Sequence, residues 1–339
     1  MDGLAAHSLV LQTRFAGFPS PKLGEHFAIT ESKVPNAAPA NGVLVQILWM
    51  SADPYLRNRM DSFFQPGQVL SGYVSGKVLL SNHAKWKAGD YFGANLPFAT
   101  VQQVTQLNEF INLSPYVSSE KELSLGIGLL GMPGSTAYAG LDLHQVSAGD
   151  RVWINACTGA VGSLAGQIAK NVKKCQLVLG SAGSKDKCDL AKREFGYDEC
   201  FDYHEIKPKD ALAKLAPEGL DFVFENVGGD HFEAGVSNLR LHGRVALCGA
   251  ISGYNNGGAS NALPLGLVIY KQLKIEGFIC GDWLHGKRGN FLQDMTEWYK
   301  QGLVTKQETV FQGIEQWPKA FATLFEPGNS HVGKVVVSV

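Results

Sequence analysis

The stretch from residue 151 to residue 172 constrains the fold most strongly, because it has the pattern of a buried strand, a glycine turn and a helix. Residues 151–155 form the strand candidate, and the turn contains Gly159 and Gly162. Apolar residues then recur at helical spacing: Val161, Leu164, Ala165, Ile168, Ala169 and Val172. Gly159 permits a tight turn, and Gly162 lets the positive N-terminus of the helix approach an anion. The pattern therefore predicts a binding site for the pyrophosphate of a dinucleotide.

Beyond residue 150 the chain alternates between apolar strand candidates and helical segments. The predicted strands are residues 152–155, 177–181, 199–203, 222–227, 245–249 and 275–280. Between them, residues 185–195 are predicted as a helix, with Ser184 as a possible N-cap and Gly196 closing it. Six strands with helices between them predict an α/β fold, a Rossmann doubly wound parallel sheet.

The first part of the chain has a different sequence pattern. Short alternating strands are predicted at residues 43–48 and 74–80, with turns and several prolines around them. This pattern is typical of a mostly β, barrel-like domain. We predict that domain at residues 1–130, the Rossmann domain at 131–303, and a C-terminal return to the first domain at 304–339. A ligand would then bind in the cleft between the two domains.

Charge and composition restrict the partners. The net charge is −1, with no basic field for nucleic acid and no polybasic run for a membrane surface. The N-terminus lacks the basic and apolar regions of a signal peptide, so we expect a cytoplasmic protein. Residues 123–141 and 245–270 carry no charge, but glycines and prolines interrupt both, and we interpret them as buried strand, turn and helix pieces. These observations predict a small-molecule partner, and neither nucleic acid nor membrane.

The six cysteines are predicted to be reduced structural thiols. None of them forms a Cys-x-x-Cys pair, and none has a histidine at metal-ligand spacing. They are Cys157, Cys175, Cys188, Cys200, Cys248 and Cys280. The sequence thus predicts neither a disulfide framework nor a metal site.

Basic residues stand where an NAD site usually carries an acid. About twenty residues after the glycine turn, the chain has Ser184, Lys185 and Lys187. They favour a 2′-phosphate, and so NADPH/NADP as the cofactor, although Asp186 between them argues the other way. The alternative interpretation is a helix N-cap followed by a solvated first turn.

Five dispersed segments together resemble one known family. They are residues 51–57, 131–138, 155–170, 224–229 and 248–254. In this order they are similar to the zinc-independent medium-chain reductases of the alkenal double-bond reductase and prostaglandin reductase group. The resemblance implies a GroES-like first domain beside the Rossmann domain, a homodimer, and NADPH-dependent reduction of the carbon–carbon double bond of enals and enones.

The resemblance also bears on zinc. Zinc-dependent relatives carry Gly-His-Glu in the first domain, where this chain has Gly72, Tyr73 and Val74, and their four-cysteine lobe is missing here. Without a Lewis acid, hydrogen bonds have to stabilise the negative charge that develops on the substrate, which suits conjugate reduction.

The resemblance implies a set of site residues. Those expected to bind the cofactor are Thr136, Gly159, Ala160, Val161, Gly162, Ser184, Lys187, Tyr203, Asn226, Cys248, Gly249 and Phe278. Of these, Lys187 and Tyr203 match residues that contact the 2′-phosphate in the family. His331 stands where the family has an asparagine, so that cofactor contact stays open, with Asn329 as a second possibility.

Tyr254 is the catalytic candidate. The resemblance implies that its phenol stabilises the enolate formed when hydride reaches the β-carbon, whereas the sequence alone also fits an exposed loop tyrosine. Tyr55 and Tyr73 match tyrosines of the substrate pocket, and each could instead be a core aromatic. No residue is assigned as proton donor to the α-carbon.

Two alternative functions remain open at this point. One is an NADPH quinone oxidoreductase of the same superfamily, and the other is a non-catalytic, crystallin-like NADPH-binding protein. The sequence does not fix which enal or enone would be the substrate.

Overall fold

The computed structural model describes residues 3–15, 22–255, 263–326 and 331–339 of the 339-residue chain. The chain divides into two compact units. The first comprises Met1–Gly131, Glu308–Pro327 and Val335–Val339, and the second comprises Met132–Gln307 and Gly328–Lys334. The predicted C-terminal return, residues 304–339, spans both units in this division. Its described residues 331–334 belong to the second unit, because Gly333 pairs there with Gly159.

The second unit contains a six-stranded parallel sheet, as predicted. In spatial order its strands are β10 (Glu199–Asp202), β9 (Leu177–Ala182), β8 (Arg151–Ile154), β11 (Leu220–Glu225), β12 (Leu239–Leu247) and β13 (Lys274–Gly277). Every pair of neighbours runs parallel. The strand order reverses between β8 and β11, which confirms the doubly wound fold and places the switch point there.

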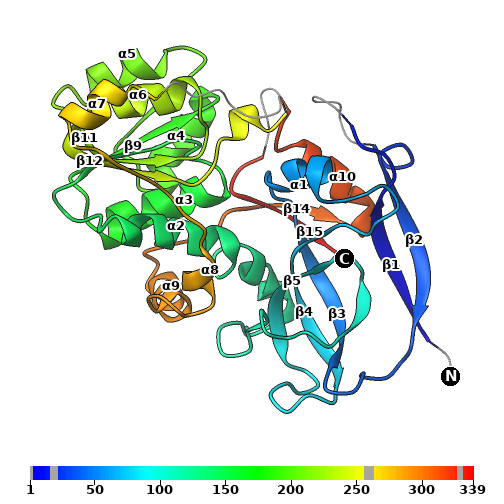
Figure 1. The fold of residues 1–339 in the computed structure, drawn as a ribbon. Helices are drawn as coiled ribbons and strands as arrows, with labels where there is room; N and C mark the ends of the chain where they lie inside the picture. The colour runs from blue at the N-terminus through cyan, green and yellow to red at the C-terminus, as the bar shows by residue number, and fades with distance from the viewer. Residues whose placement is uncertain (1–2, 16–21, 256–262, 327–330) are drawn as a thin grey trace. The chain divides into compact units, whose positions relative to one another are not determined.

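Helices cover both faces of this sheet, with α5 and α6 on one face and α2 and α3 on the other (Figure 1). The helices of the unit are α2 (Met132–Leu143), α3 (Ala160–Gln167), α4 (Lys185–Glu194), α5 (Pro208–Leu215), α6 (Asp230–Asn238), α7 (Leu265–Tyr270), α8 (Gly281–Leu284) and α9 (Phe291–Lys300). One π turn, Ile168–Val172, continues α3. Trp153, Phe222 and Phe224 are completely buried, and Trp153 belongs to a hydrophobic cluster with Leu179 and Val223.

The first unit is mostly β, also as predicted. Strands β1 (Leu4–Leu11) and β2 (Phe27–Val34) form an antiparallel pair. A second sheet has the order β14 (Glu308–Gln312), β15 (Lys334–Ser338), β3 (Val43–Ser51), β4 (Ser71–Ser81), β5 (Tyr91–Pro97) and β7 (Ile111–Asn112), with β6 (Val101–Val104) paired to β3. Helices α1 (Leu56–Ser62) and α10 (Trp317–Ala322) and the 3₁₀ helix Glu120–Ile127 pack on it. The predicted C-terminal strand returns here, because β15 pairs antiparallel with β3.

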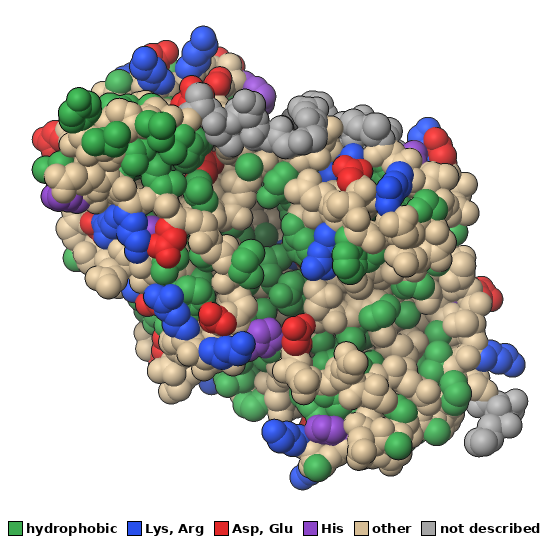
Figure 2. Space-filling model, viewed as in Figure 1, with side chains coloured by type: hydrophobic (Ala, Val, Ile, Leu, Met, Phe, Trp, Pro, Cys, Tyr) green, Lys and Arg blue, Asp and Glu red, His purple; other side chains and the backbone are tan. Residues whose placement is uncertain are grey.

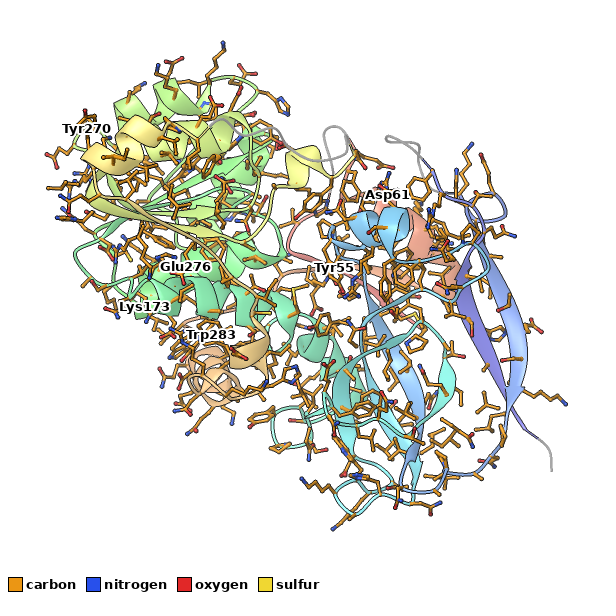
Figure 3. All side chains as sticks on the ribbon, viewed as in Figure 1. Tyr55, Asp61, Lys173, Tyr270, Glu276 and Trp283 are labelled. Carbon is orange, nitrogen blue, oxygen red and sulfur yellow. The ribbon has the colours of Figure 1, made fainter. Side chains whose placement is uncertain are left out.

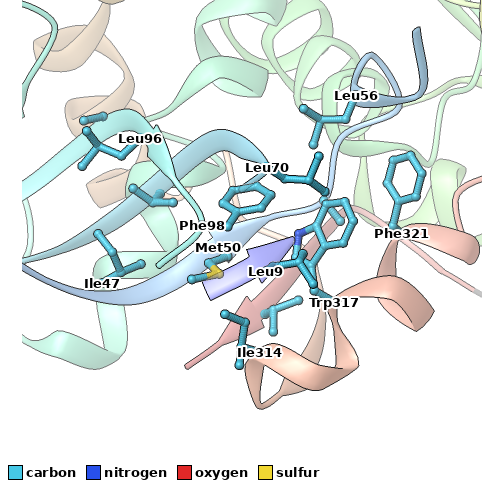
Figure 4. Packing of buried hydrophobic residues seen from close by; sticks show 14 of the residues in the cluster. Leu9, Ile47, Met50, Leu56, Leu70, Leu96, Phe98, Ile314, Trp317 and Phe321 are labelled. Carbon is cyan, nitrogen blue, oxygen red and sulfur yellow. The ribbon is translucent and has the colours of Figure 1, made fainter. Parts of the chain in front are cut away.

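Trp317 is at the centre of the hydrophobic core of the first unit (Figure 4). Its ring stacks on Phe321 at 5.0 Å between centroids, and its indole N–H donates to the carbonyl of Ser51 at 3.0 Å. The indole therefore fixes α10 against the end of β3, with its polar atom satisfied.

The two uncharged runs are divided among several elements. Residues 123–141 include the end of a 3₁₀ helix and most of α2, and residues 245–270 include the end of β12 and α7. Within the described parts of the chain, no helix has both the length and the apolar character needed to cross a membrane. All six cysteines are free thiols.

Candidate functional site

Asn155 ties the ends of the two central strands of the parallel sheet together. It is completely buried just after β8. Its Nδ2 donates to Oε1 of Glu225 at 2.8 Å, and its Oδ1 accepts from the backbone N–H of Asn226 at 2.7 Å. Asn226 returns a bond from its own Nδ2 to the Asn155 carbonyl at 3.0 Å. The switch point is thus held by a closed set of polar contacts.

Glu225 is the acceptor around which the next turn is built. The same Oε1 also accepts from the N–H groups of Val227 at 2.7 Å and Gly228 at 2.8 Å. Burial raises the pKa of this carboxyl, although these hydrogen bonds act in the opposite direction. Neither Glu225 nor Asn155 is among the site residues predicted from the sequence. The available signal was an acid at the end of an apolar strand, immediately before Asn226.

The glycine turn after β8 differs from the prediction in one respect. Its left-handed residue is Ala156, with φ of 50°, whereas Gly159 is extended and forms the N-cap of α3. Gly162 is the position that excludes a side chain, since a Cβ there would overlap the carbonyl oxygen of Ala156. The start of α3 can therefore pack directly on the turn.

This packing leaves the first turn of α3 suited to an anion. The N–H groups of Ala160, Val161 and Gly162 have no partner within a helix that begins at Ala160, and they carry the positive end of its dipole. These three N–H groups at the start of α3 fit a pyrophosphate.

The C-terminal segment of the second unit, residues 331–334, lies against the same turn. Gly333 donates its N–H to the carbonyl of Thr158 at 2.7 Å, and it is paired with Gly159 in a parallel bridge. Gly333 has φ of 68°, and a Cβ there would overlap the Gln307 carbonyl, so only glycine fits this position. His331 lies two residues earlier on this segment and is half-buried, whereas Asn329 lies outside the described residues.

The residues predicted to bind a 2′-phosphate follow β9 and its neighbour β10. Ser184 caps α4, with its Oγ accepting from the N–H of Lys187 at 3.3 Å, as the N-cap prediction required. Lys185 points into solvent and pairs with Asp189 at 2.6 Å, so it behaves as a solvated helix residue. Tyr203 extends over the neighbouring backbone, because a Cβ on Gly183 would lie 2.8 Å from its hydroxyl.

Lys187 is half-buried in the first turn of α4, unlike the exposed Lys185. Burial lowers the pKa of its ammonium, and the thiol of Cys157 on the turn acts in the opposite direction. A partly desolvated ammonium is suited to binding a phosphate monoester. Ser184 and Lys187 follow β9, and Tyr203 follows the neighbouring strand β10. Their binding to a 2′-phosphate stays a prediction.

The loop that carries Tyr254 is bound to the Glu225 turn. The N–H groups of Cys248 and Gly249 donate to the Glu225 carbonyl at 2.9 and 3.1 Å. The N–H groups of Ile251 and Ser252 then donate to the carbonyls of residues 226 and 227, at 3.1 and 3.0 Å. The position of this loop therefore depends on the turn below it.

Tyr254 is half-buried at the end of the 3₁₀ helix Ile251–Gly253, so it is not the exposed loop residue of the alternative interpretation. Its hydroxyl accepts from the N–H of Ala250 at 3.3 Å. Burial raises the pKa of this phenol. The hydroxyl therefore keeps its proton at neutral pH and can donate it in a hydrogen bond.

Three other predicted cofactor residues have their side chains packed within the second unit. Thr136 donates its hydroxyl to the Met132 carbonyl at 2.7 Å, within α2. The ring of Phe278 packs 6.1 Å from that of Phe224, and burial raises the pKa of the Cys248 thiol to about 12. Their roles at the cofactor stay predictions.

Tyr55 and Tyr73 belong to the first unit and are half-buried, and Tyr55 packs against its hydrophobic core, as the alternative interpretation allowed. Tyr55 lies beside α1 (Figure 3), with the guanidinium of Arg59 at 5.2 Å from its ring centroid. Tyr73 lies in β4 opposite Asn95. Within the described residues, no group of three or more His, Cys, Asp or Glu side chains could hold a metal ion.

Comparison with known proteins adds independent findings. A family model described as "Zinc-binding dehydrogenase" matches residues 160–300, and one described as "N-terminal domain of oxidoreductase" matches residues 7–111. A 2-alkenal reductase (NADP(+)-dependent) of Nicotiana tabacum is 37% identical, over 98% of this chain and 96% of the relative. Prostaglandin reductase 1 of Mus musculus is 36% identical over 98% of each chain. The crystal structure of CurA in complex with NADPH from Vibrio vulnificus superposes with a TM-score of 0.83, at 35% identity, over 98% of this chain and 99% of that chain.

Proposed function

The chain belongs to the medium-chain dehydrogenase/reductase family that includes 2-alkenal reductases and prostaglandin reductases, and we propose on this premise that it is an NADPH-dependent reductase of enals and enones. The full-length similarity to the tobacco 2-alkenal reductase is the observation that carries the proposal. A Rossmann unit and a GroES-like, mostly β unit are the expected frame for this chemistry.

The residues at the strand ends fit the cofactor. The side-chain-free surface at Gly162 and the first turn of α3 would receive the pyrophosphate. Lys187 and Tyr203, with Ser184 beside them, would bind the 2′-phosphate. When bound, NADPH supplies a hydride to the β-carbon of the substrate double bond.

Tyr254 would stabilise the charge that develops on the substrate carbonyl oxygen. Because burial raises the pKa of its phenol, the hydroxyl stays protonated and can donate to an oxyanion. One preorganised donor of this kind contributes about 2.7–4 kcal/mol to a transition state. Tyr55 and Tyr73 would border the substrate, and the chain would work without zinc, since Tyr73 stands where zinc-dependent relatives have histidine.

A substrate panel tests the proposal. The purified protein is incubated with NADPH and a 2-alkenal, an enone or a quinone, and products are identified by mass spectrometry. We expect saturated carbonyl products from the enal and the enone. Turnover of the quinone alone would instead support a quinone oxidoreductase, and NADPH binding without any turnover would support the non-catalytic alternative.

We also propose that the protein is a homodimer. Strand β13 is at the edge of the parallel sheet, and α7 beside it carries three exposed apolar side chains, Leu265, Ile269 and Tyr270, at 64%, 69% and 84% exposure. Figure 2 shows hydrophobic side chains gathered over this part of the second unit, and Figure 3 labels Tyr270 at its margin. An apolar patch beside an open sheet edge is typical of a protein interface.

Light scattering after size-exclusion chromatography tests the dimer. We expect twice the chain mass for the wild type and a shift toward the monomer for Ile269→Glu. A wild-type monomer at micromolar concentration would contradict the proposal.

The free thiols also support the proposal that the protein works in a reducing compartment such as the cytoplasm. Cell fractionation tests this, and recovery in an oxidising, membrane-enclosed fraction would contradict it.

A further inference from the structure

Three cysteine sulfurs from distant parts of the second unit meet at one place. The Sγ of Cys200 lies 2.6 Å from that of Cys188 and 3.5 Å from that of Cys157. Each comes from a different element, since Cys157 is on the glycine turn, Cys188 on α4 and Cys200 on β10. The proposed reaction uses none of these thiols.

We propose that Cys188 and Cys200 form a redox modification site, a dithiol that closes to a disulfide within the native fold. A disulfide bond is about 2.05 Å long, so the two sulfurs have to approach by only about 0.5 Å. Cys200 is partly exposed, whereas Cys188 and Cys157 are 5% and 0% exposed. An oxidant therefore reaches Cys200 first, and Cys188 is the thiol that resolves it.

A hydroperoxide is the class of oxidant that this site would take. The Cys200 sulfur attacks the O–O bond, forms a sulfenic acid and releases an alcohol, or water when the oxidant is hydrogen peroxide. The Cys188 sulfur then attacks the sulfenic sulfur, forms the S–S bond and releases water. The two thiols lose two electrons and two protons in total, and a thiol reductant reverses the bond by exchange. Hydrogen bonding to Cys200 and burial raise the pKa of the Cys188 thiol, and hydrogen bonding to Cys157 and burial raise that of Cys200 although its bond to Cys188 acts in the opposite direction. The reaction is therefore slow and needs a sustained oxidant.

The disulfide would act on the cofactor site. Cys188 directly follows Lys187 in the first turn of α4, so drawing Cys188 toward β10 displaces the lysine proposed for the 2′-phosphate. This consequence rests on the proposed function. We expect the KM for NADPH to rise about fivefold or more in the oxidised protein, with kcat unchanged. By linkage, bound NADP⁺ should oppose disulfide formation.

Peptide mapping of the full-length chain tests the site itself. The reduced protein is treated with hydrogen peroxide, its remaining thiols are alkylated, and non-reducing digests are analysed by mass spectrometry. We expect a linked peptide pair containing Cys188 and Cys200 that disappears with dithiothreitol. Cys188→Ser and Cys200→Ser should each abolish it. Cys175→Ser removes a buried thiol elsewhere in the unit and should leave it unchanged.

The peptide map of the wild-type protein tests the disulfide site even if a variant fails to fold. Alkylated Cys188 beside an oxidised Cys200, or a link from Cys200 to Cys157, would overturn the site. A mapped disulfide with an unchanged KM would refute only the effect on the cofactor. Failure to reduce any enal or enone would refute the proposed function and leave the mapped site standing.

Discussion

Replacing Glu225 by alanine should be among the most damaging single changes in the second unit. Its Oε1 accepts from the side chain of Asn155 and from the N–H groups of Val227 and Gly228. Glu225→Ala removes this acceptor and leaves all three donors without it, in a region where Asn155 is completely buried.

The cost follows from the number of donors that lose their acceptor. Each buried donor without a partner costs about 1–3 kcal/mol, so the donors of Asn155 and Gly228 together cost about 2–6 kcal/mol, and the half-buried N–H of Val227 adds less because water can reach it. Total unfolding free energies are about 5–15 kcal/mol, so the loss would be a large fraction of stability. Glu225→Gln is the matched control. It keeps an oxygen acceptor and the side-chain size, and it should cost about 1–2 kcal/mol because neutral acceptors bind less strongly.

Urea unfolding at pH 7 measures both variants, with kcat as a second readout. The loop that carries Tyr254 is hydrogen-bonded to the carbonyls of residues 225–227, so the alanine variant should also lose kcat. An alanine variant within about 0.5 kcal/mol of wild type, the usual range for surface changes, would refute the reasoning. A glutamine variant as unstable as the alanine variant would show that the charge, and not the acceptor, is what the turn requires.

Three further predictions follow from the same unit. Lys187→Ala should weaken NADPH binding about tenfold or more and leave NADH unchanged, since one charge-assisted bond is worth about 1.5–3 kcal/mol; titration with both cofactors checks this, and Lys185→Ala, which changes a solvent-exposed lysine, should have no effect. Tyr254→Phe should lower kcat about 100-fold to 1,000-fold with an unchanged NADPH dissociation constant, and an unchanged kcat in steady-state assays would remove Tyr254 from the chemistry. Burial lowers the pKa of His231 to about 4, so the unfolded chain binds more protons between pH 6.5 and 4 and stability falls as the pH falls. Between pH 7 and pH 5 this histidine should cost about 2 kcal/mol in urea unfolding, and His231→Phe should lose that part of the pH dependence; equal slopes for both proteins would contradict it.

The strands of the parallel sheet could be predicted because they are buried on both faces and read as apolar runs. The predicted strand ends were less accurate where the chain is polar or where a side chain leaves the strand to pack in the core. Strand β12 begins at Leu239, earlier than predicted, because its first half includes Arg240 and His242. Strand β13 ends at Gly277 rather than residue 280, because Phe278 leaves the strand to pack on Phe224.

Local geometry was predictable where one short segment carries it, as in the N-cap of α4. It was not predictable where geometry depends on contacts between distant segments. The left-handed residue of the turn is Ala156, which intrinsic preference disfavours. The bonds from Glu225 to Asn155 and the meeting of Cys188 with Cys200 depend on the strand order and on the approach of α4 to β10, which no local pattern encodes.

The pairing of β15 with β3 has a consequence for how the chain is made. Ser51 of β3 lies opposite Val336 of β15, so the sheet of the first unit joins the beginning of the chain to its last residues. During synthesis, every strand of the parallel sheet leaves the ribosome before β15 does, and that sheet can form while β3 still lacks this neighbour. The first unit is therefore completed after the parallel sheet. For that interval residues 49–51 of β3, which β6 does not cover, form an open edge that a chaperone or a second nascent chain could bind.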